Sequence, residues 1–205
     1  MNAADRGAKR RAELVLAAHE LFVDKGYRSV VVADIAARAG ASHGTFYNYF
    51  DNKRDILDAV IDHYFALIRE RVFGRAIAGR RPKTLDEFCD VIATIVDHCY
   101  ELVADEPGLV NFILLEAATI DERVAERSIR NLRVYGDEAT TRIKRGMELG
   151  YIDPALDPRL TGEALLSALL AALLSAIRDG ADGLDRTRVR AQLVAFAYAT
   201  LGPVS

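Results

Sequence analysis

The segment Gly40–Phe50 (GASHGTFYNYF) carries the residues of this chain that are best suited to chemistry. Its first five residues match G-x-S-x-G, the pattern that presents a nucleophilic serine on a strand-to-helix turn in α/β-hydrolases. Its later residues are hydroxyl-bearing and aromatic, a composition typical of a short helix that contacts a phosphate backbone. The element before Gly40 discriminates between the two interpretations, because a nucleophile turn requires a buried strand there.

The residues before Gly40 favour a helix. Asp34–Ala39 (DIAARA) is a short helical pattern with a charged Arg38, and the chain has no run of strands of the kind an α/β-hydrolase requires. No acid and histidine can be assigned as partners of Ser42. We therefore expect a nucleic-acid-binding helix, no enzymatic activity and no cofactor, with a hydrolase that uses Ser42 as the weaker alternative.

The composition predicts a globular protein with a mildly basic N-terminal part. The 205 residues are 51% hydrophobic and carry a net charge of −3. Residues 1–55 contain nine Lys and Arg against seven Asp and Glu, a net of +2, and the remainder has a net of −5, so the basic part is suited to a polyanion. Two cysteines without C-x-x-C spacing and an N-terminus without an apolar signal segment indicate a cytoplasmic protein. The longest uncharged run is shorter than the roughly 20 residues that span a bilayer, so we expect no membrane association.

Helical periodicity runs through almost the whole chain. Leu14, Ala17, Ala18, Leu21 and Phe22 fall on one face of a helix that Gly26 is expected to end. Gly74–Pro82 has the composition of a linker. Asp51 is expected to cap the next helix, and further helices are expected over Thr84–Ala104, from Pro107, and over Glu122–Leu149, Pro158–Arg178 and Arg186–Leu201. The predicted fold class is all-α, with about nine helices.

The segments on either side of Gly40 have the properties of a helix-turn-helix. Two short helices joined by Ala39-Gly40-Ala41 have the required lengths and the turn glycine. Ser42 can cap the second helix, and Ile35 and Phe46 would hold the pair against the first helix. Hydroxyls and tyrosines on the second helix can contact phosphates, while His43 and Asn48 can contact base edges.

This constellation resembles the DNA-binding domain of the TetR family of transcriptional repressors. The resemblance covers about residues 10–60 and rests on Ala17-Ala18, Leu21-Phe22, Gly26-Tyr27, Asp34-Ile35-Ala36, Ala39-Gly40, Ser42, Gly44-Thr45, Tyr47, Tyr49-Phe50 and Lys53. It implies a three-helix helix-turn-helix DNA-binding domain over residues 1–53 and an effector-binding and dimerisation domain over residues 54–205. A homodimer would bind a palindromic double-stranded operator as a repressor and would be released by a small molecule.

The resemblance also implies roles for individual residues. Positions matching Thr45, Tyr47, Tyr49 and Lys53 hold the DNA backbone, those matching Ser42, His43 and Asn48 lie nearest the bases, and Gly44 permits close approach. Val31 departs from the family, which often has a threonine or serine there that caps the preceding helix and touches a phosphate. A lost cap costs about 1 kcal/mol.

Two other groups of polar residues have less specific patterns. Arg6, Lys9, Arg10 and Arg11 form either an arm for the minor groove or a solvated tail. The Asp97-His98-Cys99 cluster with Glu101 has the residue types of metal ligands, but consecutive helical residues point about 100° apart and cannot converge on one ion. We therefore expect no metal site.

The C-terminal part offers a candidate dimer interface and a candidate effector pocket. Its most apolar helices are expected to form a four-helix interface between two copies, with a purely internal core as the alternative. The candidate interface residues are Leu165, Ala168, Leu169, Ala172, Ser175, Ala176, Leu193, Phe196 and Ala197. The candidate pocket residues are Phe65, Ile95, His98, Cys99, Leu102, Phe112, Leu115 and Tyr135, which predict an uncharged or amphipathic organic effector. A ligand-independent architectural DNA-binding protein is the alternative function, and a fully packed centre would favour it.

Overall fold

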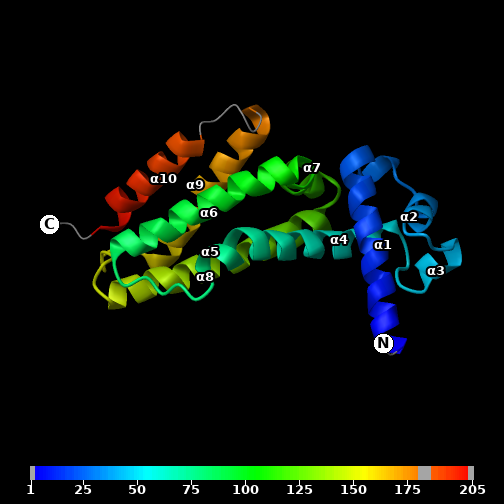
Figure 1. Cartoon of the computed structure of the whole chain (residues 1–205), viewed down its shortest axis with the longest axis horizontal. Helices are drawn as coiled ribbons and strands as arrows, with labels where there is room; N and C mark the ends of the chain where they lie inside the picture. Colours follow the sequence, from blue (N-terminus) through cyan, green and yellow to red (C-terminus); the bar gives the residue numbers. More distant parts are fainter. Residues whose placement is uncertain (1–2, 180–185, 203–205) are drawn as a thin grey trace.

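The structure is a computed structural model that describes residues 3–179 and 186–202. Within these ranges every regular element is helical, which confirms the predicted fold class (Figure 1). The helical segments are α1 (Ala3–Lys25), η1 (Tyr27–Ser29), α2 (Val32–Arg38), α3 (His43–Tyr47), α4 (Lys53–Ile68), η2 (Arg69–Gly74), α5 (Arg75–Ile77), α6 (Leu85–Asp105), α7 (Pro107–Asn111), η3 (Phe112–Glu116), η4 (Ala117–Thr119), α8 (Glu122–Glu148), α9 (Pro158–Asp179) and α10 (Arg186–Leu201).

The helices α1 to α3 form a compact head at one end of the molecule. Figure 1 shows α1 lying across the end of α4, with α2 and α3 on its outer side. The predicted apolar face of α1 is buried, and Leu14, Ala18 and Phe22 have no exposed surface. Gly26 ends α1 as predicted, because its φ of +76° is favourable only for glycine and its N–H bonds the Phe22 carbonyl at 3.0 Å.

A single continuous helix connects the head to the rest of the chain. The helix α4 packs on α1 at one end and on α8 along its length, and it continues through the π-helical segment η2 into α5. The predicted linker Gly74–Pro82 is therefore wrong over its first residues, because helix persists to Ile77. Burial of Val72 and Ala76 stabilises this extension in spite of Gly74, and burial is a tertiary effect that composition does not reveal.

The helices α5 to α10 form an elongated body in which α8 packs along α9, and α6 packs against both α9 and α10. The acidic face of α6 is covered by α10, since Arg186 donates to Asp97 at 2.8 Å and to Glu101 at 3.3 Å. At the other end of α10, the Tyr198 hydroxyl donates to Asp86 at 2.8 Å. The carboxylates considered above as metal-ligand types thus serve to attach α10.

Side-chain caps define several of the helix starts, since Thr84 caps α6 and Asp121 caps α8. Pro107 opens α7 at its first position, as the sequence predicts. The predicted cap of α4 by Asp51 is wrong by one residue. Asn52 caps this helix, because its Oδ1 accepts the N–H groups of Arg54 and Asp55.

None of the helices within residues 3–179 and 186–202 combines the length and the apolar character needed to cross a bilayer.

Candidate nucleic-acid interface and internal cavities

Ser42 acts as a helix cap in the helix-turn-helix. Gly40, with a φ of +60°, follows helix α2, and no strand precedes it as a nucleophile turn would require. The Ser42 Oγ accepts the Thr45 N–H at 3.0 Å and lies 2.8 Å from the Thr45 hydroxyl oxygen. These bonds fix the first turn of α3 and confirm the predicted cap.

The surface of α3 presents most of the predicted DNA-contact residues to solvent. Ser42, His43, Gly44, Tyr47 and Asn48 are exposed. The ring of His43 meets that of Tyr47 edge-on at 5.0 Å, so the two project together from one side of the helix. A Cβ on Gly44 would meet only the Ser42 Oγ, at 3.9 Å, which leaves the backbone there open to a close partner.

Thr45 and Tyr49 lie at the edge of this surface, and both are partly buried. Tyr49 packs against the apolar core of the head, whereas 49% of Tyr47 is exposed. The difference follows from the i, i+2 spacing of the two tyrosines, which places them on different sides of a helical turn.

Lys53 has a structural position within the head. Its Nζ donates to the carbonyls of Val30 at 2.7 Å, Tyr27 at 2.9 Å and Arg28 at 3.4 Å. The amine also lies 4.4 Å from the centre of the Tyr27 ring, and burial lowers the pKa of Lys53. A contact between Lys53 and the phosphate backbone of DNA stays a prediction. The amine would have to make this contact while it binds the carbonyls at the end of η1, or after leaving them.

The N-terminal cations are helical and lie beside α3. Arg6, Lys9 and Arg10 occupy the first turns of α1 and, with Glu13, Thr45 and Tyr49, line a hollow of about 450 Å³. Arg10 pairs with Glu13 at 2.8 Å, so Arg6 and Lys9 give this hollow its net positive charge. An extended arm is therefore not formed by these residues in the structure. Sequence periodicity could not reveal this hollow, because α1 and α3 are brought together by the core beneath them.

Val31 stands at the N-cap of α2 with 55% of its side chain exposed. A valine side chain cannot accept a hydrogen bond, so the cap that a threonine or serine would supply is missing, as expected. The Asp34 carboxylate partly compensates, because it accepts the Val31 N–H at 3.1 Å.

The body contains two adjoining apolar cavities. The larger, of about 100 Å³, lies between α6, α8, α9 and α10 and is lined by apolar or aromatic residues together with Glu138 and Arg142. The smaller, of about 40 Å³, shares Phe73, Tyr135, Leu166 and Leu169 with it. Both π-helical segments contribute to these walls, Phe73 from η2 and Leu114 from η3. Such π-helical turns frequently occur at functional sites.

The predicted pocket residues separate into two groups in the structure. Ile95 lines the larger cavity, Phe65, Cys99 and Leu102 line the smaller one, and Tyr135 lines both. The Tyr135 hydroxyl donates to the Phe65 carbonyl at 2.8 Å, and burial raises the pKa of Tyr135 to about 12.

The other three predicted pocket residues line neither cavity. The His98 Nδ1–H donates to the Val72 carbonyl at 3.1 Å, so the imidazole supplies a hydrogen-bond donor to a backbone oxygen of η2. Phe112 packs between Phe22 and Tyr64, and Leu115 is 48% exposed. A helical period alone does not distinguish a cavity wall from a solid core or an outer face.

Residues 14–60 match the family described as bacterial regulatory proteins, tetR family. This match covers the helix-turn-helix and the first half of α4. Among curated proteins, it is 25% identical over 123 residues to the nucleoid occlusion factor SlmA of Haemophilus influenzae, which covers 58% of this chain and 54% of the relative. The chain thus spans about half the length of this relative.

Solved structures have the same fold over nearly the whole chain. The SmeT–triclosan complex has a TM-score of 0.75 at 21% identity, covering 93% of this chain and 90% of that one. FadR from Bacillus subtilis, in complex with stearoyl-CoA, has a TM-score of 0.74 at 21% identity, covering 91% of this chain and 96% of that one.

The predicted dimer residues lie largely on the inner side of α9 and α10. Leu165, Ala168, Leu169 and Leu193 line the larger cavity, and Ala197 is fully buried within the chain. Phe196 is 45% exposed, while the side chains of Ala172, Ser175 and Ala176 lie outside the described residues. The outer face of α9 is instead formed by Leu160, Ala164, Ser167, Ala171 and Leu174.

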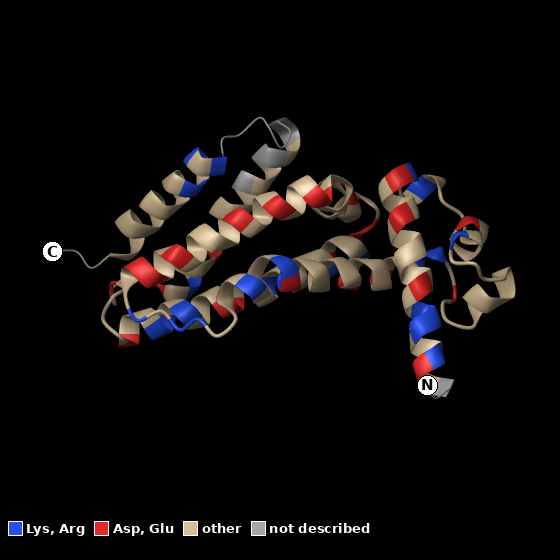
Figure 2. Cartoon of the chain, in the orientation of Figure 1, with Lys and Arg blue, Asp and Glu red and all other residues tan. Residues whose placement is uncertain are grey.

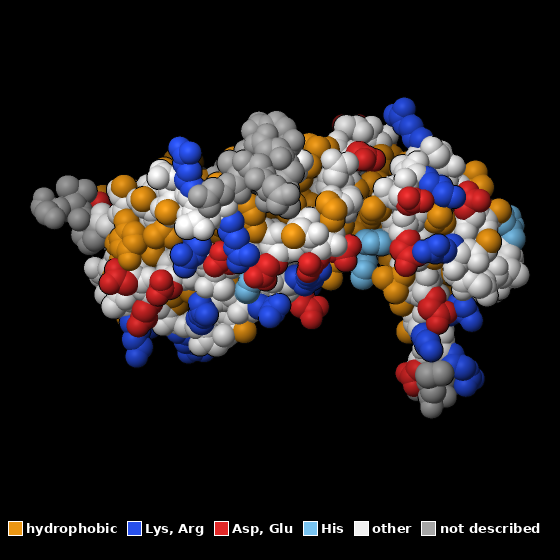
Figure 3. All heavy atoms as spheres, turned by 45° about the horizontal axis from the view of Figure 1, so that its top comes forward, with side chains coloured by type: hydrophobic (Ala, Val, Ile, Leu, Met, Phe, Trp, Pro, Cys, Tyr) orange, Lys and Arg blue, Asp and Glu red, His pale blue; other side chains and the backbone are white. Residues whose placement is uncertain are grey.

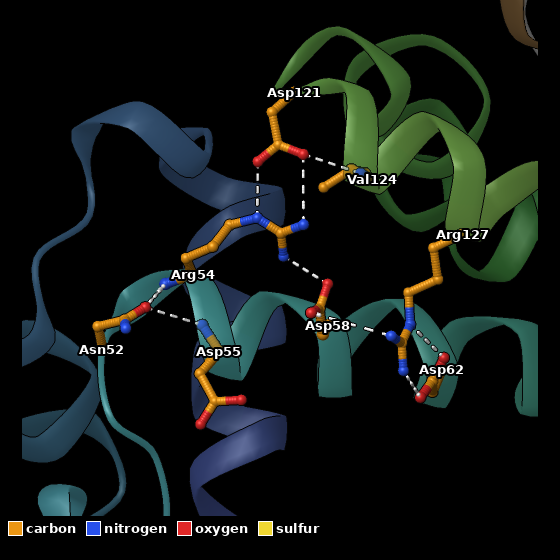
Figure 4. A network of polar contacts seen from close by, with 8 residues as sticks. All are labelled: Asn52, Arg54, Asp55, Asp58, Asp62, Asp121, Val124 and Arg127. Carbon is orange, nitrogen blue, oxygen red and sulfur yellow. Dashed lines mark hydrogen bonds and ion pairs between the residues drawn. The ribbon is translucent and has the colours of Figure 1, made fainter.

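A chain of ion pairs connects α4 to the start of α8 (Figure 4). Arg54 donates through Nε to Asp121 at 2.6 Å and through Nη2 to the other Asp121 oxygen at 3.3 Å. It also pairs with Asp58, and Arg127 on α8 pairs with both Asp58 and Asp62. Asp121 caps α8 at the same time by accepting the Val124 N–H at 2.8 Å, so the helix that leaves the head is attached to a helix that lines both cavities.

Histidines gather where the head meets the body, as Figure 3 shows in pale blue. The His19 ring on α1 lies 6.0 Å from His63 and 4.8 Å from Tyr64, both on α4. The His19 Nδ1 and the Tyr64 hydroxyl are inaccessible to solvent and have no hydrogen-bond partner among the described residues. Burial and, secondarily, the nearby His63 lower the pKa of His19, while Glu106 and Glu20 oppose this effect.

This junction predicts that the molecule becomes less stable in mild acid. Since the pKa of His19 is lower in the folded chain than its ordinary value of 6.5, the unfolded chain binds more protons below that pH. The free energy of unfolding should therefore fall as the pH drops from about 6.5 toward the folded pKa. Urea unfolding at about pH 7.5 and about pH 5.5 measures the difference, and His19→Gln should reduce it. The exposed His43→Gln serves as the control, and an equal pH dependence in all three proteins would contradict the assignment.

Proposed function

We propose that this protein is a transcriptional regulator, acting as a repressor in the cytoplasm, that binds a palindromic operator as a homodimer. The observation that carries this proposal is the exposed polar face of α3, with the hollow of α1 cations beside it. Hydroxyl and imidazole groups on such a helix can contact phosphates and base edges, and the cations add a sequence-independent attraction to the backbone. In this proposal Ser42, His43 and Asn48 lie nearest the bases, and Thr45, Tyr47 and Tyr49 hold the phosphates.

A second copy is part of the proposal because one short α3 contacts too few bases for useful specificity. Two heads related by a two-fold axis would reach half-sites one helical turn, about 34–36 Å, or a multiple of it apart. The outer face of α9, together with Phe196 on α10, offers apolar surface for this pairing, including Leu160 at 67% and Leu174 at 41% exposure. The two helices from each copy would form a four-helix interface.

The body is proposed to bind the effector in its two adjoining cavities. Solved neighbours of this fold are described in complex with triclosan and with stearoyl-CoA, and SmeT is described as the repressor of a multidrug efflux pump. In one conformation of the dimer the separation of the two heads fits the operator, and in the other it does not. To release DNA, the effector must bind the second conformation more tightly than the first. Moving a population from 99:1 to 1:99 requires about 5.5 kcal/mol of differential binding.

Selection of bound duplexes from a random pool tests the DNA-binding part of the proposal. We expect enrichment of an inverted repeat, retention that weakens steeply with salt, and release of the enriched duplex by a member of a metabolite panel. Sedimentation of the free protein should give a dimer. A chain that sediments as a monomer, or that binds no duplex at low ionic strength, would contradict the proposal. An architectural DNA-binding protein without a ligand is the weaker candidate, because the centre of the body contains cavities.

A further inference from the structure

We propose that the effector is an anionic amphipath with a slender, unbranched apolar chain, and that Arg142 binds its anionic group at the mouth of the larger cavity. This inference rests on the proposed function, for which it specifies the class of ligand. Three observations carry it. A basic hollow adjoins the larger cavity, Arg142 lines both spaces and has a donor that no described residue pairs, and the apolar space is narrow.

The basic hollow has a volume of about 700 Å³ and lies between α8 and the segment that precedes α6. Its charged lining residues are Arg81, Lys83, Arg142 and Arg145 against Glu138, which gives four positive charges minus one, a net of +3. The whole chain has a net charge of −3, so this concentration of cations runs against the average. Figure 2 shows Lys and Arg segments on α8 and in the segment before α6, at the end of the body away from the head, with Asp and Glu segments among them.

The basic hollow and the larger cavity share three residues. Phe88, Glu138 and Arg142 line both spaces, so a ligand that fills the cavity can place one end in the hollow. The remaining residues of the cavity wall are apolar or aromatic, and they cannot neutralise a charge. The charged end of an amphipath would therefore lie at Arg142 and its apolar end among α6, α8, α9 and α10.

Arg142 has unused hydrogen-bonding capacity at this position. Its Nη2 donates to Glu138 at 3.2 Å, while its Nε is inaccessible to solvent and has no hydrogen-bond partner within the described part of the chain. The guanidinium presents parallel donors that match a carboxylate or phosphate group, and such charge-assisted pairs are stronger than neutral hydrogen bonds. A ligand anion would compete with the single carboxylate of Glu138, whereas a cation would meet a net positive surface.

The apolar space favours a slender chain over a bulky ring system. Its larger part of about 100 Å³ is well below the roughly 300–1,000 Å³ of a typical ligand pocket. The smaller cavity continues it beyond Phe73, Tyr135, Leu166 and Leu169. Rotation of these four shared side chains would join the two spaces into a narrow channel, which fits an unbranched chain.

Calorimetric titration of the full chain without DNA tests the proposal with octyl compounds that differ only in their head group. Octanoate and octyl phosphate should bind at least about tenfold more tightly than octanol, and octyltrimethylammonium should bind most weakly. Arg142→Met should reduce the affinity for both anions to that for octanol and leave octanol unchanged. Glu138→Gln should strengthen anion binding, because it removes the competing carboxylate. The ratio of octanoate to octyl phosphate affinity distinguishes a free acid from a phosphate-bearing ligand.

Two further variants separate charge recognition from packing. Arg142→Lys should retain the preference for anions, and Arg130→Met should change nothing, since Arg130 on the same helix pairs with Glu126 at 3.6 Å outside the cavity walls. The proposal is overturned if octanol binds as tightly as octanoate, if Arg142→Met weakens every compound equally, or if no octyl compound binds. Selection of duplex DNA proceeds without ligand, so its failure would be recognised separately as failure of the proposed function.

Discussion

Replacing Phe46 with alanine should destabilise the head by about 3–5 kcal/mol and abolish operator binding. Phe46 has no exposed surface, and its ring lies 5.7 Å from that of Phe50 beneath α3. The helix α3 has five residues, which is too short to remain helical without tertiary packing. Loss of this ring therefore leaves a cavity in the core of the head and removes the support for the proposed DNA-contact face. Thermal unfolding followed by circular dichroism gives the stability, and fluorescence anisotropy with the selected duplex gives the affinity.

The adjacent Tyr47 provides the matched control, because it is exposed on the same helix. Tyr47→Phe should change the stability by no more than about 0.5 kcal/mol. It should nevertheless weaken operator binding by about tenfold or more, since in the proposed complex each head loses a hydroxyl that donates to a phosphate. Full operator affinity in Phe46→Ala would contradict the packing account. Unchanged affinity in Tyr47→Phe would remove this residue from the proposed interface and leave the fold unaffected.

Replacing Arg54 with glutamine should lower the free energy of unfolding by about 1–2 kcal/mol and weaken the coupling between effector and operator. The Arg54 side chain is 24% exposed and that of Asp121 is 38% exposed, so solvent screens part of their attraction. The physical reason for the functional effect is that this contact attaches α4, which leaves the head, to α8, which lines the cavities (Figure 4). Urea unfolding measures the first effect, and the ratio of operator affinities with and without effector measures the second.

A double-mutant cycle with Asp121→Asn isolates the ion pair from the helix cap. Asparagine is itself a good N-cap, so this change removes the charge and retains the bond to the Val124 N–H. The exposed pair Arg159–Glu163 on α9 is the control, and Arg159→Gln should cost less than about 0.5 kcal/mol. Additive losses for Arg54→Gln and Asp121→Asn would show that the pair contributes no coupling.

Much of this molecule follows from local sequence patterns. The period of Leu14, Ala17, Ala18, Leu21 and Phe22 predicts the buried face of α1, and the structure confirms it. Ser42 and Pro107 start their helices as predicted, because caps and first-turn prolines act within a few residues. The sequence predicts the helix-turn-helix for the same reason. The lengths of its two helices, its turn glycine Gly40 and its hydroxyl-bearing residues all lie within one short segment of the chain.

Positions that depend on distant partners were not predictable in this way. The helix α9 is apolar on nearly every side, so its sequence could not decide that Leu165, Ala168 and Leu169 face the larger cavity. Composition likewise could not place the Lys53 amine on the carbonyls of η1, or continue α4 beyond Gly74. The sequence determined which residues form helices and which helix face is polar, because the helical repeat is a local property of the chain. Only the tertiary structure decided which apolar face is inside and which cations meet at the basic hollow, because these depend on packing between segments far apart in sequence.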